Sequence, residues 1–201
     1  MPTDSKLLPV TVTPTFEKKN DEQPNTGKFI DVPTTAYYAD AVAWAVEKNI
    51  TNGTGENTFS PETACTRAQM VTFLWRVAGS PEPVDSTNPF VDIGGPDNYY
   101  FKAVMWAVEK GITNGTGTGM FSPDDTVTRA QVVTFLYRYE NAEAGTNSGF
   151  ADVEKNAWYA KAVTWAVDHK ITNGTGNNQF SPNSNCTRGQ IVTFLYRDMA
   201  E

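Results

Sequence analysis

The stretch C-T-R-A-Q-M-V-T-F-L-W-R occupies residues 65–76, and it returns as V-T-R-A-Q-V-V-T-F-L-Y-R at 127–138 and as C-T-R-G-Q-I-V-T-F-L-Y-R at 186–197. Thr66 followed three residues later by Gln69 has the form of a capping box, in which each of the two side chains accepts the other residue's backbone amide. The apolar residues that follow recur at helical spacing. We therefore predict a helix from about Arg67 to Val77 and an equivalent helix in each copy.

The same repeat extends toward the N-terminus of each copy. Every copy opens with F-x-D, at residues 29, 90 and 150, and continues through an aromatic pair, an A-V-x-W-A-V block, the string I-T-N-G-T-G and an F-S-P turn. The A-V-x-W-A-V block predicts a first helix at about residues 38–49, which ends at the Asn-Gly step. Pro61 then prevents helix formation until the capping Thr is reached. The expected fold class is all-α, with three tandem helix-loop-helix repeats.

Repeat boundaries divide the chain into a linker or tail at 1–28, repeats at 29–79, 90–141 and 150–201, and linkers at 80–89 and 142–149. From the aromatic pair to the last Arg, the offsets between copies stay at 62 and 59 residues, so the copies are equivalent position by position. Two helices of this length do not bury their own apolar faces, so the three copies must pack on one another. An open solenoid and a closed pseudo-threefold unit both remain consistent with the residues.

Composition excludes several classes of function. The formal net charge of −7 over 201 residues argues against duplex nucleic acid or an anionic membrane surface as the main partner. No apolar run reaches the length of a membrane span, and the N-terminus lacks the features of a signal peptide, so any export signal is removed or lies outside this chain. Cys65 and Cys186 form no metal-binding set with the single histidine, and we expect no metal and no cofactor.

These motifs together resemble the S-layer homology domain: F-x-D-V, a helix ending in I-T-N-G, an F-x-P turn and a T-R-A-[EQ] helix start, over residues 29–201. The resemblance implies a pseudo-trimer around a central three-helix bundle, with grooves between projecting lobes. It also implies non-covalent attachment of a larger extracellular surface protein to secondary cell-wall polysaccharide of Gram-positive bacteria, often a pyruvylated one. The chain departs from the family pattern in three respects: Gln replaces the common Glu, Gly189 replaces Ala, and Cys stands at 65 and 186.

The residues expected to bind ligand are foremost the three arginines of the repeated T-R motif: Arg67, Arg129 and Arg188. Each lies in the first turn of a helix, where unsatisfied amides and a guanidinium would together hold a carboxylate. The alternative is that each arginine pairs with an aspartate of the F-x-D motif. If the arginines serve binding alone, replacing them should abolish attachment and leave thermal stability almost unchanged.

Three further sets of residues recur with the arginines. One set is the aspartates Asp31, Asp92 and Asp152. They either orient the arginines or accept hydrogen bonds from sugar hydroxyls, or else they cap the following turn. The capping glutamines Gln69, Gln131 and Gln190 remove negative charge from the site, which should favour an anion. Secondary candidates are Trp44, Trp106 and Trp165, expected mainly as core residues, and Gly53, Gly115 and Gly174, expected to adopt positive φ near the ligand.

Catalysis is not expected, because glycoside hydrolysis needs two facing carboxylates and each repeat offers only one aligned aspartate. His169 aligns with Lys48 and Lys110, so it is interpreted as a solvated surface residue. The alternative to polysaccharide binding is a protein-binding or scaffold module on the bacterial surface. The cysteines are expected to be buried small hydrophobes. A disulfide is the alternative, if the three helix starts converge on one axis.

Overall fold

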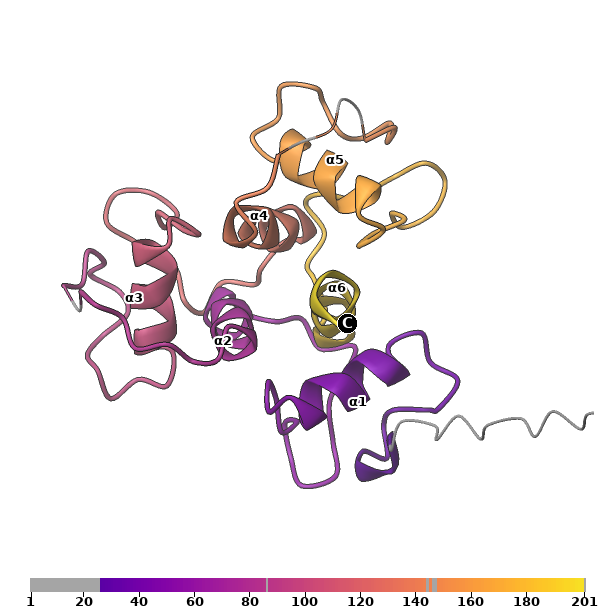
Figure 1. Cartoon of the computed structure of the whole chain (residues 1–201), viewed down its shortest axis with the longest axis horizontal. Coiled ribbons are helices and arrows are strands. Elements are labelled where there is room, and N and C mark those ends of the chain that lie inside the picture. Colours follow the sequence, from indigo (N-terminus) through magenta and orange to yellow (C-terminus); the bar gives the residue numbers. More distant parts are fainter. Residues whose placement is uncertain (1–25, 86, 144, 146–147, 201) are drawn as a thin grey trace, which may run out of the picture.

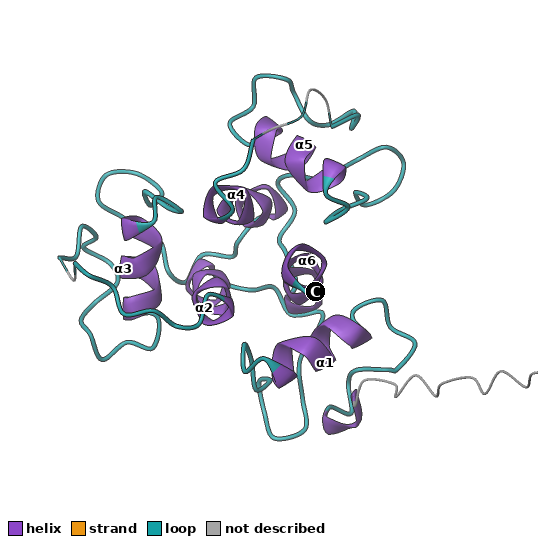
Figure 2. Cartoon of the chain, in the orientation of Figure 1, coloured by secondary structure: helices purple, strands orange, loops and turns teal. Residues whose placement is uncertain are grey.

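Two α-helices from each repeat form the regular structure of the part of the chain that is described. The computed structural model describes residues 26–200 apart from 86, 144 and 146–147, so the predicted tail at 1–28 lies almost wholly outside the described residues. The helices are α1 (Ala39–Glu47), α2 (Arg67–Val77), α3 (Phe101–Glu109), α4 (Arg129–Tyr139), α5 (Ala160–Asp168) and α6 (Arg188–Met199), preceded by the 3-10 helix η1 (Thr26–Lys28). The all-α prediction is confirmed: the described residues contain only isolated β-bridges besides helices and loops (Figure 2).

The second helix of each repeat begins as the sequence predicts. Thr66 Oγ1 accepts from the amide of Gln69 at 3.2 Å, and Gln69 Oε1 accepts from the amide of Thr66 at 3.1 Å, which completes the capping box. The same reciprocal pair starts α4 and α6. A capping box stabilises a helix start through contacts within four residues. The position of the helix start can therefore be read from the local sequence.

The three second helices form a central bundle, and the three first helices lie outside it as separate lobes (Figure 1). Within this arrangement α3 packs on α2, α5 packs on α4 and α1 packs on α6. Each outer helix therefore rests on the central helix of another repeat, and repeat 1 closes the ring against repeat 3. The closed pseudo-threefold arrangement is thus the one adopted, rather than the open solenoid.

Backbone hydrogen bonds close this ring at the segments just before the central helices. Cys65 N donates to Cys186 O at 3.0 Å, Cys186 N donates to Val127 O at 2.9 Å, and Val127 N donates to Cys65 O at 2.9 Å. Each residue of the trio thus donates to one repeat and accepts from the other. Both cysteines are free and fully buried, as the buried-hydrophobe interpretation predicts.

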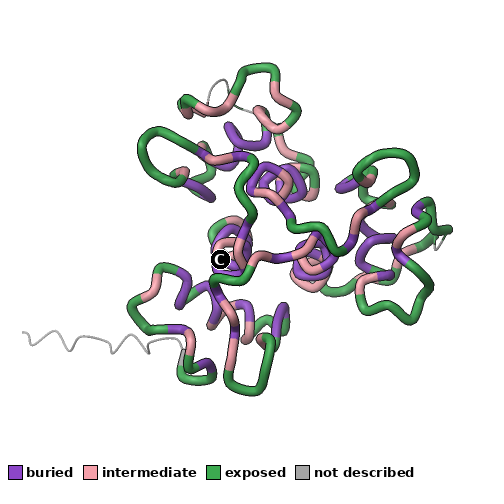
Figure 3. Tube along the Cα trace, turned by 180° about the vertical axis from the view of Figure 1, so that it is seen from behind, coloured by how far each residue is buried: buried purple, intermediate pink, exposed green. Residues whose placement is uncertain are grey.

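The core is continuous from the bundle into the lobes. Buried residues line the central helices and the inner faces of the outer helices, while the long loops at the tips of the lobes are exposed (Figure 3). The fully buried phenylalanines of the three F-S-P turns, Phe59, Phe121 and Phe180, belong to this core. They fix the loops that carry the candidate site against the bundle.

Candidate binding grooves

Each candidate arginine reaches out of its own repeat into the next one around the ring. Arg67 Nε donates to the carbonyl oxygen of Phe121 at 2.8 Å. Its guanidinium carbon lies 4.9 Å from the ring centroid of Phe121 and 5.6 Å from that of Phe135. Arg129 and Arg188 repeat this geometry on the following repeats, with Nε donating to Phe180 O and Phe59 O at 2.8 Å. The arginine is therefore an inter-repeat contact, and its partner is a carbonyl rather than an aspartate.

The guanidinium groups are buried charges, and two of the three residues, Arg67 and Arg129, also line a groove. Arg67, Arg129 and Arg188 are 3, 3 and 4% exposed, and burial lowers the pKa of each below its ordinary value. The Nη2 atoms of Arg67 and Arg129 are buried without a hydrogen-bond partner. Arg188 differs, because its Nη2 donates to Thr51 Oγ1 at 3.3 Å. Buried donors of a charged group without a partner are costly, so two of the three arginines are left with a strong unmet demand for an acceptor.

The helix amides do not contribute to an anion site, which corrects the sequence-based expectation. The amide of Arg67 donates to Asp125 O at 2.9 Å, and that of Ala68 donates to Pro123 O at 3.0 Å. The amide of Gln69 donates to Oγ1 of the capping residue Thr66. The equivalent amides of α4 and α6 donate to carbonyls of repeats 3 and 1 in the same way. The neighbouring F-S-P loop thus occupies the helix start, and any anion must be bound by the guanidinium.

Two of the arginines lie in grooves to which all three repeats contribute. The groove at Arg67 has a volume of about 300 Å³, and the groove at Arg129 has a volume of about 340 Å³. The first is lined by Arg67, Thr113, Gly115, Thr116, Gln131, Thr134, Phe135, Arg138 and Trp158. The second is lined by Tyr37, Arg129, Thr172, Asn173, Gly174, Thr175, Gln190, Thr193, Phe194 and Arg197. Each list contains two arginines, Arg67 with Arg138 and Arg129 with Arg197, and neither contains a carboxylate. Each groove is therefore suited to an anion.

The aspartates of the F-x-D motif lie behind the grooves. Asp31 Oδ1 accepts from the amide of Phe59 at 2.8 Å, and Oδ2 accepts from the amide of Ser60 at 2.7 Å. Ser60 has φ of 58°, an unfavourable conformation that these two bonds help to hold. Asp92 and Asp152 hold the other two F-S-P turns identically. The aspartates therefore hold the distant F-S-P turns rather than the turn that directly follows each of them, and they help to fix the phenylalanine whose carbonyl accepts from the arginine.

The other predicted residues divide between groove and core. Gln131 and Gln190 line the grooves while their Oε1 atoms complete the capping boxes. Gly115 has φ of 84° and lies against Met120 O and Phe90, so the expectation of positive φ is confirmed, as it is at Gly53 and Gly174. The tryptophans do not line either groove: Trp106 and Trp165 are 2% exposed and belong to the core, and Trp44 is half-buried on α1.

Two arginines and two aromatic residues that line the grooves were not predicted from the sequence. Arg138 and Arg197, from the closing T-F-L-[WY]-R, line the grooves and donate through Nη1 to the carbonyls of Ile112 and Ile171. The exposed members of the aromatic pairs also line them, since Tyr37 is 61% and Trp158 is 63% exposed. These residues could have been identified from the sequence, because a polar or aromatic side chain recurs at each of their positions in all three copies. Only the fold shows that the arginine and the aromatic ring of one groove come from different repeats.

The single histidine of the chain lies at the surface, just after α5 in repeat 3. His169 is exposed, and its ring packs on Trp165 with Nδ1 2.9 Å from that residue's carbonyl oxygen. Among residues 26–200 with the stated gaps, no group of three His, Cys, Asp or Glu side chains is placed to hold a metal ion. None of the helices in this part of the chain is both long and apolar enough to cross a membrane.

Comparison with known proteins gives relatives that include a cell surface protein and an S-layer protein. The chain is 37% identical over 118 residues to "Cell surface protein" of Thermoanaerobacter kivui, covering 56% of this chain and 15% of that protein. It is 28% identical over 172 residues to "S-layer protein sap" of Bacillus anthracis, covering 83% of this chain and 20% of that protein. It is 25% identical over 164 residues to "Amylopullulanase" of Thermoanaerobacterium thermosulfurigenes, covering 78% of this chain and 9% of that protein.

The family model described as "S-layer homology domain" matches residues 28–71, 89–133 and 149–192. These three segments contain all three arginine motifs and follow the three structural repeats. The chain spans about a fifth or less of the length of the relatives named above, so it corresponds to one segment of each. Together the matched segments cover more than half of the sequence, and the chain belongs to the S-layer homology domain family.

Proposed function

We propose that the arginine grooves bind the carboxylates of an acidic secondary cell-wall polysaccharide, such as one bearing pyruvate ketals. Membership of the S-layer homology family and the surface-protein relatives support a cell-surface anchoring module with an extracellular location. We further propose that the partner at the cell surface is the polysaccharide. In this proposal the chain is the anchoring part of a longer protein, and any catalytic activity of that protein belongs to its other parts.

The observation that carries the proposal is the unpartnered Nη2 of Arg67 and of Arg129. Each belongs to a guanidinium fixed by a carbonyl on one edge and by two phenylalanine rings, in a groove without a lining carboxylate. A planar guanidinium held in this way accepts a carboxylate with little further loss of conformational entropy. Binding an anion there also satisfies a donor that is otherwise desolvated without a partner.

The rest of the groove suits a sugar that carries the acid group. Trp158 lines the groove at Arg67 and Tyr37 lines the groove at Arg129, and each offers exposed aromatic surface. Threonines and a glycine of the I-T-N-G-T-G loop also line both grooves. Volumes of about 300 and 340 Å³ fall at the small end of ligand sites, which is appropriate for a short piece of a polymer rather than for a folded protein partner. Repeated grooves on one chain would then engage a repeating polymer at more than one point.

The test is sedimentation of the purified chain with wall sacculi, before and after mild acid treatment that removes acidic ketal groups. We expect the parent chain to sediment with untreated sacculi and to remain in solution after the treatment. Arg67→Lys with Arg129→Lys should lose most binding, because lysine keeps the charge but lacks the fork that meets a carboxylate in two places.

Arg188→Lys is the matched control. Its Nη2 already has Thr51 as partner, so this variant should lose less binding than Arg67→Lys alone or Arg129→Lys alone. Circular dichroism and the thermal midpoint must show that all variants are folded. Sedimentation that is unaffected by acid treatment would contradict the proposal and would favour a protein partner on the wall instead.

A further inference from the structure

The groove at Arg67 runs along one face of α4. On this side it is lined by residues at positions i, i+3, i+4 and i+7 of the helix, namely Gln131, Thr134, Phe135 and Arg138. Residues with this spacing share one face of a helix, so the groove follows α4 over about 10 Å. Arg138 marks the C-terminal end of the groove on this helix.

A second pocket begins at Arg138, and we refer to it as the end pocket. It has a volume of about 470 Å³ and lies among the C-terminal ends of α2, α3 and α4. Its lining residues are Ala78, Pro81, Trp106, Lys110, Arg138, Tyr139 and Asn141. Arg138 lines both the groove and the end pocket, so the two meet at this residue. A ligand that extends along the groove past Arg138 therefore reaches the end pocket.

The end pocket has groups suited to an acidic sugar. Arg138 and Lys110 supply cations, and its lining residues include no carboxylate. Lys110 Nζ lies 3.3 Å from Glu109 Oε1 in an exposed pair, which contributes little, so the ammonium group remains available to a ligand. Tyr139 is half-buried against Trp106, with ring centroids 5.9 Å apart, and offers the rest of its ring as a surface for a sugar face.

The linker forms a fixed wall of the end pocket. Trp75 Nε1 donates to Pro81 O at 2.8 Å, and the amide of Val84 donates to Glu109 Oε2 at 2.8 Å. Between them, Glu82 forms an ion pair with Lys102 on α3 at 2.6 Å. These contacts hold residues 81–84 along α3 without any ligand. Binding in the end pocket therefore requires little further ordering of the chain.

The corresponding place beyond the groove at Arg129 has different charges. Asp198 stands at the position of Tyr139, and Glu140 stands at the position of Ala78. Burial, with Glu140 nearby, raises the pKa of Asp198 to about 7, so the two carboxyl groups lie close to each other. Carboxyl groups placed there disfavour an anion. Of the two arginine grooves, the one at Arg67 is thus the one with a cationic extension.

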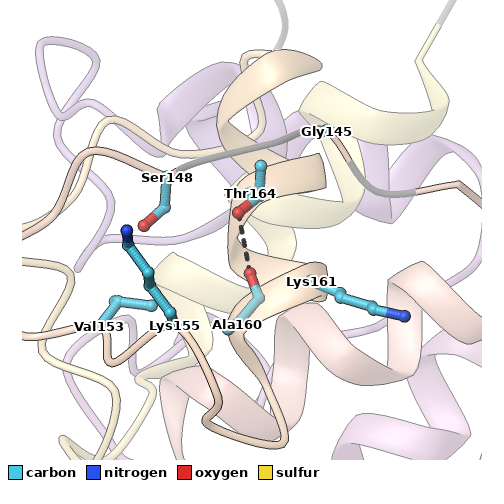
Figure 4. A pocket seen from close by; sticks show the side chains of 7 residues that line it. All are labelled: Gly145, Ser148, Val153, Lys155, Ala160, Lys161 and Thr164. Atoms are coloured by element: carbon cyan, nitrogen blue, oxygen red, sulfur yellow. Dashed lines mark hydrogen bonds between the residues drawn. The ribbon is translucent and has the colours of Figure 1, made fainter.

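Two other pockets of the described residues are separate from the arginine grooves. One, of about 300 Å³, includes Lys155 and Lys161, and Figure 4 shows these two lysine side chains pointing away from each other. The other, of about 580 Å³, lies beside Trp44 and includes Asp40 and Glu47. Neither shares a lining residue with an arginine groove, so neither continues one.

We propose that the end pocket is a second subsite of the groove at Arg67 and takes the next acidic unit of the same polysaccharide. The inference rests on the proposed function, because it extends the ligand whose first carboxylate is bound at Arg67. The polymer would follow α4, pass Arg138 and place a second acidic group beside Lys110, with a sugar face on Tyr139. The groove at Arg67 would then bind a longer stretch of polymer than the groove at Arg129.

The test is titration calorimetry on the full chain carrying Arg129→Lys, so that binding reports mainly on the groove at Arg67. The probes are wall-polysaccharide fragments of one and of two repeating units, with one pyruvate ketal on each unit. We expect the two-unit fragment to bind about five- to tenfold more tightly, because it gains a charge pair and an aromatic contact. Two equivalent units alone would give a gain of about twofold, since either unit can occupy one site. Lys110→Ala should reduce the gain to about that value.

Lys48→Ala is the matched control. Lys48 is the residue equivalent to Lys110 in repeat 1, but it lines the separate pocket beside Trp44. This variant removes the same charge from the chain and should keep the full gain of the two-unit fragment. Circular dichroism must show that each variant is folded.

The outcomes separate the subsite from the proposed function. A gain of no more than about twofold in the chain with Lys110, or the same gain with Lys110→Ala, would overturn the subsite. An equal loss of the gain in Lys48→Ala would also overturn it, because the effect would then come from overall charge. In these cases binding of the one-unit fragment leaves the proposed function intact. If the one-unit fragment does not bind even to the parent chain, the proposed function fails and the subsite fails with it.

Discussion

Replacement of Arg67 by alanine should destabilise the fold as well as impair binding. The side chain joins repeat 1 to repeat 2 through a hydrogen bond to Phe121 O and contacts with two phenylalanine rings. The expectation from sequence was a loss of binding with almost unchanged stability. The structure leads us to expect a loss of stability as well, because the guanidinium is a buried inter-repeat contact and not a free surface group.

The size of the effect follows from these contacts. A hydrogen bond from a charged donor contributes about 1.5–3 kcal/mol, and each contact with an aromatic face adds about 0.5–1 kcal/mol. Arg67 is 3% exposed, so its charge is desolvated and its pKa is lowered, and removing that charge recovers part of the desolvation cost. The net loss should be about 2–3 kcal/mol. For a domain of this size the thermal midpoint then falls by about 4–12 °C.

The assay is calorimetric unfolding, with urea unfolding as a second measure. Two further variants separate the loss of the hydrogen bond and charge from the loss of packing. Arg67→Met fills most of the volume but has no donor, so it should recover only the packing part of the loss. Arg67→Lys keeps a charge, and it should be intermediate in stability. A midpoint for Arg67→Ala within about 1 °C of the parent would refute the inter-repeat role and restore the binding-only interpretation.

Two further predictions concern buried titratable groups. Asp198 has a buried oxygen without a partner, and burial, with Glu140 nearby, raises its pKa to about 7 from 3.8. The folded state therefore holds this proton more tightly than the unfolded state, so the unfolding free energy should fall as pH rises from about 4 to 7, by about 1–2 kcal/mol after allowance for partial exposure. Urea titrations should show Asp198→Asn to be more stable than the parent above pH 7 and little changed near pH 4, and equal stability at pH 8 would disprove the effect. Burial also raises the pKa of Cys65 to about 11 and of Cys186 to about 12. In the native chain at pH 8 both thiols should therefore resist alkylation, and in the unfolded, non-reduced chain mass spectrometry should find two alkylated thiols; a mass lower by two hydrogens without alkylation would show a disulfide instead.

Features set by short-range contacts were predictable from the sequence. The capping box of Thr66 and Gln69 spans four residues, so the second helix and its starting point follow from local hydrogen bonding. Gly115 stands in an Asn-Gly turn and adopts the positive φ that glycine allows. Repetition of these motifs then fixed the number of units, and the arginines were identified as the residues to test.

Tertiary structure decided what those residues contact. The partners of Arg67 and Arg188 lie 54 and 129 residues away in the chain, so no local pattern shows that they are carbonyls of other repeats. The helix amides expected to hold an anion are taken by the same neighbouring loops. Trp44 and Trp106 occupy equivalent positions in sequence, yet only the second is covered. Equivalent residues acquire different surroundings because three copies on one chain have two linkers between them, and the third junction is made by packing and hydrogen bonds without a linker.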